Sequence, residues 1–167
     1  KKIDINSFEW YRNALTATIE NQEDLSLIVS FNSPYLELNF DQIDQLDKIQ
    51  STSQTSFETY HIKGQMKNLN IETVLIKDLS INSTMKNDIL SSLTIEGSLE
   101  GQDTFHLKGS RLGNIQNITF DLTNIQAFSK WFKEDKKFSG QNVTIKAVKD
   151  LSNPEKGYTG TMQIKDL

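Results

Sequence analysis

Apolar and polar residues alternate along much of the chain, which is the pattern of β-strands that bury one face. Between residues 93 and 100, Leu, Ile, Gly and Leu alternate with Thr, Glu, Ser and Glu. A polar turn at Gly101–Asp103 separates this run from the next one, so residues 93–108 are predicted to form a hairpin. Similar runs predict strands at 15–20, 25–31, 118–122, 143–147 and 158–164.

The alternation changes phase between residues 74 and 81. Val74 and Ile76 occupy even positions, whereas Leu79 and Ile81 occupy odd ones. A slip of one residue moves every following side chain to the other face of a strand. This phase change therefore predicts a β-bulge or a strand break.

Three short segments have apolar residues at helical spacing. They are Phe8–Ala14, Asp41–Ile49 and Ile125–Phe132, and the last follows a capping box formed by Thr123 and Gln126. Together with the strands, they predict a mainly β fold. We expect an antiparallel meander of about eight or nine strands, forming a curved, groove-like sheet with two or three short helices.

The apolar strand positions in the second half of the chain are predicted to share one face. They are Leu93, Ile95, Leu99, Phe105, Leu107, Ile118, Phe120, Val143, Ile145, Met162 and Ile164. A sheet with one apolar face has to bury it against a second sheet, against helices or against a ligand. The pattern alone favours an ordinary β core, and it does not distinguish a protein partner from an acyl chain.

Composition narrows the class of protein. The chain has 167 residues, a net charge of −4 and no cysteine. Its 18 basic residues are scattered among 22 acidic ones, which argues against a nucleic-acid partner. The lack of cysteine excludes disulfides and thiolate zinc sites. Residues 1–167 are interpreted as a single β-rich segment, excised from a longer repetitive protein because both ends interrupt strand-like patterns.

No residue pattern in the chain indicates catalysis or a metal site. His61 and His106 each lie in a strand pattern, and His106 is predicted to face solvent. Neither histidine has the spacing of a metal ligand, and Asp41, Asp44 and Asp47 fit the polar face of a helix. Nucleophile-elbow and phosphate-binding motifs are absent from the sequence. We therefore expect no enzyme activity, no cofactor and no metal, although a histidine beside a carboxylate in a pocket would reopen that question.

The order of elements from residue 99 onward carries a family resemblance. Gly109–Arg111 precedes a strand that leads into the predicted helix, and Lys137–Gln141 leads into the next strand. The last strand has the spacing Tyr158-x-Gly160-x-Met162-x-Ile164-x-Asp166-Leu167, and Ser33–Phe40 forms a matching segment upstream. This layout resembles the AsmA-like family, in particular its YhdP branch and, more distantly, TamB.

The resemblance implies a fold and a function. Proteins of this family are anchored in the inner membrane of Gram-negative bacteria by a segment that this sequence lacks, and they cross the periplasm as a long β-sheet groove that carries phospholipid. The eleven apolar residues would then contact lipid, and Phe128, Trp131 and Phe132 of the predicted helix would cover part of the groove. The partners implied are phospholipid and flanking segments of the same chain.

Two further expectations concern selectivity and the alternative function. No basic cluster in the sequence is placed to recognise phosphate, so little head-group selectivity is expected. Lys130, Lys133, Lys136 and Lys137 fit a solvated helix face better than a head-group site. The alternative is a structural or protein-binding β-domain with a fully packed core, which would use exposed strand edges to bind partner chains.

Overall fold

Ten β-strands make up the described part of the chain. The computed structural model describes residues 2–10, 13–22, 25–38, 58–71, 74–87, 89–100, 103–125, 140–153 and 155–166. The strands are β1 (Lys2–Trp10), β2 (Asn13–Asn21), β3 (Ser26–Leu38), β4 (Thr59–Ile71), β5 (Val74–Lys86), β6 (Ile89–Leu99), β7 (Asp103–Leu112), β8 (Ile115–Asn124), β9 (Gln141–Asp150) and β10 (Thr159–Asp166). The described residues form no helix, and the fold is all-β.

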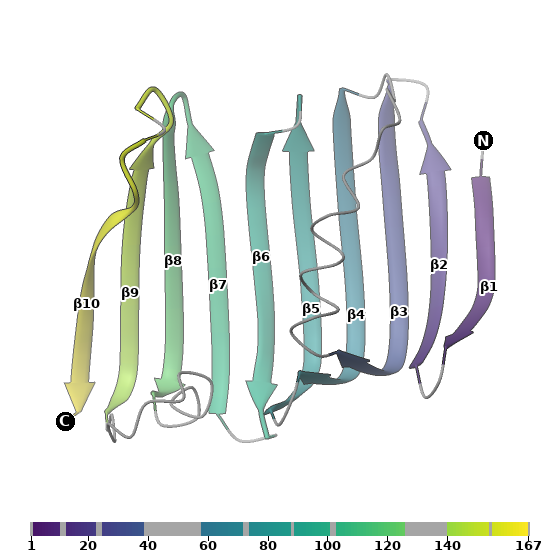
Figure 1. The fold of residues 1–167 in the computed structure, drawn as a ribbon, viewed down its shortest axis with the longest axis horizontal. Coiled ribbons are helices and arrows are strands. Elements are labelled where there is room, and N and C mark those ends of the chain that lie inside the picture. Colours follow the sequence, from purple (N-terminus) through teal and green to yellow (C-terminus); the bar gives the residue numbers. More distant parts are fainter. Residues whose placement is uncertain are drawn as a thin grey trace.

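All ten strands belong to one sheet, and strands that are neighbours in the sheet are neighbours in the chain (Figure 1). The pairs are antiparallel, as predicted for a meander, except that β3 and β4 run parallel. The expectation of antiparallel pairing throughout is therefore wrong at this pair. Parallel neighbours need a connection of about a dozen or more residues, because the chain must return to the end where the first strand began. Residues 39–58 separate the two strands and provide that length.

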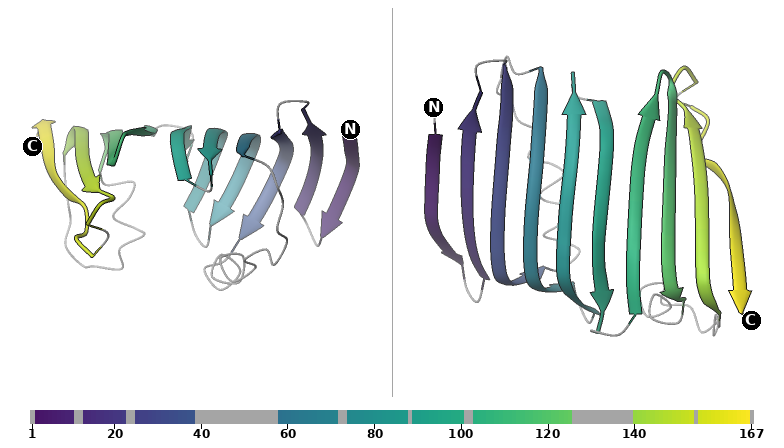
Figure 2. Two further views of the ribbon diagram at one scale, coloured as in Figure 1. Left: turned by 90° about the horizontal axis from the view of Figure 1, so that it is seen from above. Right: turned by 180° about the vertical axis from the view of Figure 1, so that it is seen from behind.

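The sheet is open, with β1 and β10 at its edges. Seen from above, it neither closes on itself nor curls strongly (Figure 2). The predicted hairpin at residues 93–108 is confirmed, because β6 and β7 pair antiparallel from Ser92 and Ser110 to Leu99 and Asp103. The tight turn between β7 and β8 contains Gly113 with a φ of 60°, a conformation that glycine adopts without steric cost.

The predicted helix at Phe8–Ala14 is wrong. Phe8 pairs with Leu15, and Trp10 pairs with Asn13, within the antiparallel pair of β1 and β2. Apolar residues at helical spacing also occur in an irregular strand, and the register of this pair shifts between Ile5 and Phe8. Pairing with the following strand therefore decided the structure of this segment.

The other two predicted helices fall largely outside the described residues. Residues 41–49 and 126–132 belong to parts of the chain that are not described. Thr123, which was predicted to cap the second of these helices, lies in β8. Its hydroxyl donates a hydrogen bond to the Thr104 carbonyl oxygen in β7 at 3.3 Å, and Gln126, its partner in the predicted capping box, lies outside the described residues.

The predicted phase change in β5 is confirmed as a bulge. The register between β5 and β6 shifts between Lys77 and Ser80, and Asp78 has a φ of 51°. Ile76 and Leu79 are three residues apart in this strand, and both are buried. The extra residue is what lets both side chains reach the same face.

The same phase change continues into β4 and β3. Met66 and Leu69 of β4 are also buried and three residues apart, and they pair directly with the two buried residues of β5. Ser33 and Leu36 of β3 pair with Met66 and Leu69 in turn. At this level the Ser33 hydroxyl lies 2.5 Å from the Ala14 carbonyl oxygen of β2, beside a register shift between β2 and β3. We call this feature, which crosses three strands, the bulge line.

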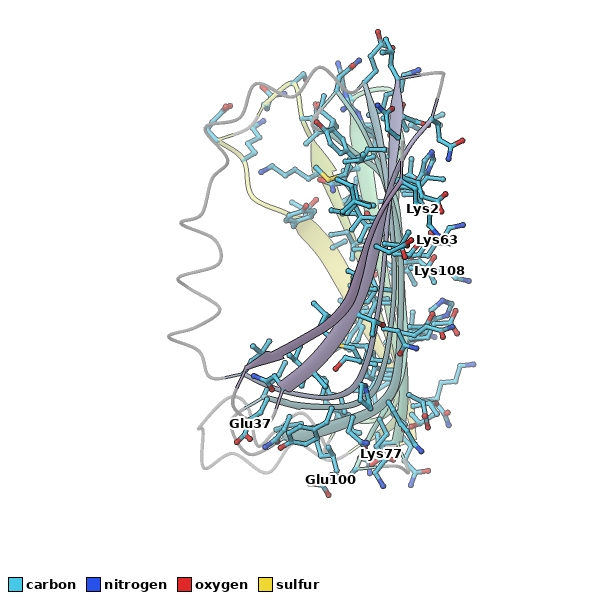
Figure 3. All side chains as sticks on the ribbon, turned by 90° about the vertical axis from the view of Figure 1, so that its right-hand side faces the viewer. Lys2, Glu37, Lys63, Lys77, Glu100 and Lys108 are labelled. Atoms are coloured by element: carbon cyan, nitrogen blue, oxygen red, sulfur yellow. The ribbon has the colours of Figure 1, made fainter. Side chains whose placement is uncertain are left out.

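The bulge line coincides with a bend in the sheet. Seen edge-on, Lys2, Lys63 and Lys108 project from one side of the sheet (Figure 3). Lys77 of β5 lies at the bulge line, and Glu37 of β3 lies just beyond it. Both residues are at the end of the sheet where the strands bend toward the side opposite those three lysines (Figure 3). Bulges increase local twist and bend the strands that carry them, which accounts for this shape.

The core lies on one face of the sheet. Its buried apolar side chains gather around the bulge line and in the strands that follow it; they are Met66, Leu69, Val74, Ile76, Leu79, Leu99, Phe105, Leu122 and Val143. Half-buried residues from both halves of the sheet, including Phe31 and Phe120, pack against this cluster.

Candidate functional site

Strand pairing aligns apolar residues in rows that run across the sheet. One row crosses all ten strands and contains, from β1 to β10, Ile3, Ile19, Val29, Ile62, Ser83, Leu93, Gly109, Ile118, Ala147 and Gly160. The next row contains, from β2 to β10, Ala17, Phe31, Gly64, Ile81, Ile95, Leu107, Phe120, Ile145 and Met162. Directly paired residues place their side chains on the same side of a sheet, so these rows define one surface, here called the apolar face.

The register brings all eleven predicted residues together on the apolar face. Seven of them belong to the two rows above; Phe105, Val143 and Ile164 form a third row with Gly97 and Leu122. Leu99 is two positions from Gly97 on β6, and therefore faces the same way. Their contact with lipid stays a prediction.

Burial divides these residues into three groups: Leu99, Phe105 and Val143 are buried, Met162 is exposed, and the other seven are half-buried. Leu99 and Val143 are each 1% exposed, so they serve as core. Met162, at the sheet edge, is 55% exposed and is accessible to a ligand. The prediction omitted Leu122, which is 5% exposed, although it continues the alternation of the residues before it. It also omitted the N-terminal part of the face, because only strand pairing shows that Phe31 belongs to the same row.

Two phenylalanine rings lie over glycines on the apolar face. A Cβ atom at Gly64 would overlap the ring of Phe31, its partner in the parallel pair. A Cβ atom at Gly97 would lie 3.0 Å from Cζ of Phe105, its partner on β7. Each ring therefore occupies the space that the missing side chain leaves, which keeps the apolar surface continuous.

The opposite side of the sheet is lined by polar residues and is here called the polar face. One of its rows crosses all ten strands and contains Asp4, Thr18, Ser30, Lys63, Asn82, Thr94, Lys108, Thr119, Lys146 and Thr161. Another includes Glu96, His106, Asp121 and Thr144 on successive strands. Side chains therefore alternate between the two faces except at the bulges, and the polar face also carries the exposed apolar residues Leu112, Ile115 and Val148.

His106 lies beside a carboxylate on the polar face. Its Nε2 atom is 3.6 Å from Oε1 of Glu96 and is shielded from solvent without a hydrogen-bond partner. The predicted orientation toward solvent is correct for the face that His106 occupies, but this ring nitrogen is not exposed. Both residues line a hollow of about 690 Å³, together with Asp121 and Thr144.

Thr144 in this hollow is not positioned for activation by His106. The Thr144 hydroxyl donates to Oδ1 of Asp121 at 2.7 Å, and it lies on β9 while His106 lies on β7. Strands two places apart are separated by roughly 9–10 Å, so the histidine is not positioned to activate this hydroxyl. The other histidine, His61, has Nδ1 3.2 Å from Oγ1 of Thr84, a pairing between adjacent strands. No reaction is assigned to either histidine.

Two carboxylates on the polar side have altered acidity. Hydrogen bonding to Lys2, whose Nζ is 3.1 Å from Oδ1 of Asp4, lowers the pKa of Asp4. Hydrogen bonds from the side chain and backbone N–H of Ser152, followed by Asn153, lower the pKa of Asp150. Both shifts come from local contacts at the surface, and neither belongs to the hollow around His106.

The described residues contain no cluster of three or more His, Cys, Asp or Glu that could hold a metal ion. In the same part of the chain, no helix is long and apolar enough to cross a membrane. The predicted helix cover of Phe128, Trp131 and Phe132 lies outside the described residues. Comparison of the chain with family models, curated proteins and solved structures gives no match.

Proposed function

We propose that this chain is a segment of an AsmA-like protein of the bacterial periplasm, and that its apolar face binds acyl chains of phospholipids moving between the inner and outer membranes. The observation that carries the proposal is the row from Ile3 to Gly160, which crosses ten strands with Ser83 as its one polar member. An acyl chain has no polar atoms, so a continuous apolar strip is the surface it requires.

The bend of the sheet supports the same proposal. The strands bend away from the side that carries Lys63 and Lys108, which are polar-face residues (Figure 3). In the proposal, the apolar face is therefore the concave side of a shallow groove. The function is non-catalytic and uses no cofactor. The partners are phospholipid and flanking segments of a longer chain, which is tethered to the inner membrane outside these residues.

The test is lipid content after purification from a bacterial host, measured by native mass spectrometry and lipid extraction. We expect bound phospholipid on the wild-type chain and its loss when Phe120→Asp and Met162→Asp are combined, because each substitution places a charge in one apolar row. The matched control combines Thr119→Asp and Thr161→Asp, which add the same charge to the polar face of the same strands.

Folding is checked by circular dichroism and urea unfolding of every variant. Met162→Asp alone is the variant expected to disturb folding least, because Met162 is already 55% exposed to solvent. A lipid-free wild-type chain that also fails to take up fluorescent phospholipid would contradict the proposal. Equal lipid loss in the apolar-face and polar-face variants would contradict it as well.

One observation favours the alternative of a protein-binding β-domain. Strand β10 pairs with β9 on one side, and no described strand pairs with its other side. Its register is regular, and it carries no proline or bulge, which are features that commonly protect an edge strand. By contrast, β1 carries a register shift between Ile5 and Phe8. In this alternative, β10 accepts an extended strand from a partner.

The alternative is tested by sedimentation equilibrium of the lipid-free chain. It predicts concentration-dependent association that Met162→Lys abolishes, because a charge pointing inward on an edge strand opposes strand addition. Thr161→Lys is the control, since it places the same charge on the polar face of β10. A chain that stays monomeric at every concentration would exclude this alternative for self-association.

A further inference from the structure

A second kind of surface adjoins the apolar face at one end of β7, β8 and β9. Arg111 pairs with Gln116, and Gln116 pairs with Lys149, so these three residues form a row across the strands. Each lies two positions beyond the apolar row that contains Gly109 and Ile118, and therefore faces the same side of the sheet. This row is not apparent in the sequence, because its members are separated by up to 38 positions.

Side-chain contacts confirm that these residues share one surface. The Tyr158 hydroxyl donates to Oε1 of Gln116 at 2.9 Å, and Nζ of Lys149 lies 5.6 Å from the centroid of the Tyr158 ring. The tyrosine therefore reaches across β9, and its ring holds the lysine ammonium by a cation–π contact. Arg111 is anchored at the other end of the row, where its Nε donates to the Gly113 carbonyl oxygen at 2.6 Å.

The spacing and charge of the row suit a phosphate group. Strands β7 and β9 are two places apart, so the Cα atoms of Arg111 and Lys149 are separated by roughly 9–10 Å. Both side chains are long enough to contact one anion placed over Gln116. No acidic residue belongs to the row, and the nearby Asp150 carboxylate accepts hydrogen bonds from Ser152 and Asn153. Arg111 and Lys149 are both half-buried, which strengthens their attraction for an anion relative to fully exposed groups.

We propose that Arg111 and Lys149, positioned by Gln116 and Tyr158, bind the phosphate of a phospholipid head group whose acyl chains lie along the adjacent apolar rows. This inference rests on the proposed function, since it needs the apolar face to hold the chains. It differs from the expectation that no basic cluster is placed to recognise phosphate, and it concerns the phosphate that phospholipid head groups share. In this arrangement an amphiphile binds in one orientation, with its phosphate at the cations and its acyl chain on the apolar surface.

The experiment compares two lipids that share one acyl chain, lysophosphatidic acid and the corresponding monoacylglycerol, both below their critical micelle concentrations. Dissociation constants are measured by isothermal titration calorimetry with the 167-residue chain. We expect about tenfold tighter binding of the phosphate lipid, as two charge-assisted contacts allow. The double variant Arg111→Gln and Lys149→Gln removes this preference and leaves binding of the monoacylglycerol unchanged.

The polar face supplies a matched control. Lys108, Thr119 and Lys146 form a row on the same three strands, with two cations flanking an uncharged residue. The double variant Lys108→Gln and Lys146→Gln removes the same charge from the other face, and we expect it to change neither dissociation constant. Tyr158→Phe, which loses the hydrogen bond to Gln116, weakens the phosphate preference only in part.

The outcomes separate this inference from the proposed function. If the wild-type chain binds neither lipid, the proposed function fails and the inference fails with it. If it binds both lipids equally, acyl binding stands and the phosphate site is overturned. A preference that survives Arg111→Gln with Lys149→Gln, or that disappears in the polar-face control, also overturns it. The last measurement repeats the titration of lysophosphatidic acid in the presence of inorganic phosphate. If inorganic phosphate competes with this lipid at micromolar concentration, the site is assigned to free phosphate instead of a lipid head group.

Discussion

Leu99 and Val143 on the apolar face are each 1% exposed, whereas Lys2 and Asp4 on the polar face keep 55% and 48% of their side-chain surface in solvent. The same contrast holds within one strand, because Glu96 on the polar face of β6 keeps 60% of its side-chain surface in solvent, whereas Leu99 of the same strand is buried. Burial of an apolar side chain contributes about 1.5–3 kcal/mol, whereas an ion pair in contact with water contributes little, because water screens it. One face therefore supplies the buried apolar contacts that stabilise the sheet, and the other supplies its contacts with water.

The largest expected difference between the faces is in core truncation. Leu99→Ala is expected to lower the free energy of unfolding by about 2–5 kcal/mol, because it leaves a cavity in a fully buried position. Thr94→Ala on the polar face of the same strand is the control, with an expected change within about 0.5 kcal/mol. Urea unfolding measures both variants. Similar losses in the two would show that the faces do not differ in this way.

The next effect concerns the glycines of the apolar face. Gly64→Ala is expected to destabilise the fold by about 1–3 kcal/mol, because the new methyl group overlaps the Phe31 ring. Adding Phe31→Leu should recover part of the loss, since a smaller side chain leaves room for the methyl group. Gly157→Ala, where no atom lies within 4 Å of the new Cβ, provides the control in the same unfolding assay. A tolerated Gly64→Ala would contradict the close approach of the ring.

A smaller effect is expected on the polar face, at the hydrogen bond between Thr144 and Asp121. Thr144→Val keeps the shape of the side chain but removes a 2.7 Å bond to a carboxylate. The loss should be about 1 kcal/mol, because the site is partly exposed to water. Thr161→Val on the adjacent strand is the comparison, measured by thermal unfolding. A loss as large as that of Leu99→Ala would mean that the polar face also contributes to the core.

The smallest effect is the dependence of stability on pH at Asp150. Its hydrogen bonds to Ser152 and Asn153 lower the pKa of the carboxyl group in the folded state. A lowered folded pKa adds stability above the unfolded value of about 3.9, and this contribution is lost as the pH falls through the folded pKa. Asp150→Asn should therefore reduce the fall in Tm as the pH drops below about 4, and Ser152→Ala should have the same direction of effect. An unchanged pH profile in both variants would contradict this account.

Strand positions and the division between the two faces were predictable from local alternation. The hairpin at residues 93–108 and the bulge at Asp78 follow from the phase of apolar residues, which depends only on the nearby sequence. The helix prediction for Phe8–Ala14 was wrong because the structure of this segment depends on pairing with another strand. Its spacing fits a helix, but hydrogen bonding to β2 stabilises the strand, and the sequence does not reveal that pairing.

The position of the candidate site was predictable only in part. The apolar residues of each strand share a side because the period of a strand is two, a property of each strand by itself, whereas the registers of the strand pairs bring all eleven onto one face of the sheet. The contribution of Phe31 to the same row depends on the parallel pairing of β3 with β4. The row of Arg111, Gln116 and Lys149 depends on the registers of two separate pairs. Neither the place of Phe31 nor this row of three residues can be predicted from a single segment of the sequence.

The sequence by itself determined that this protein is built from strands with one apolar and one polar side, because side-chain direction alternates along every strand. Only the tertiary structure decided which strands are neighbours, where the bulge line crosses the sheet, and which distant residues meet at the end of the apolar face. Those features are set by hydrogen-bond register between segments far apart in the chain. A shift of one residue in a single pair would exchange the two faces of a strand, so register carries information that no local pattern contains.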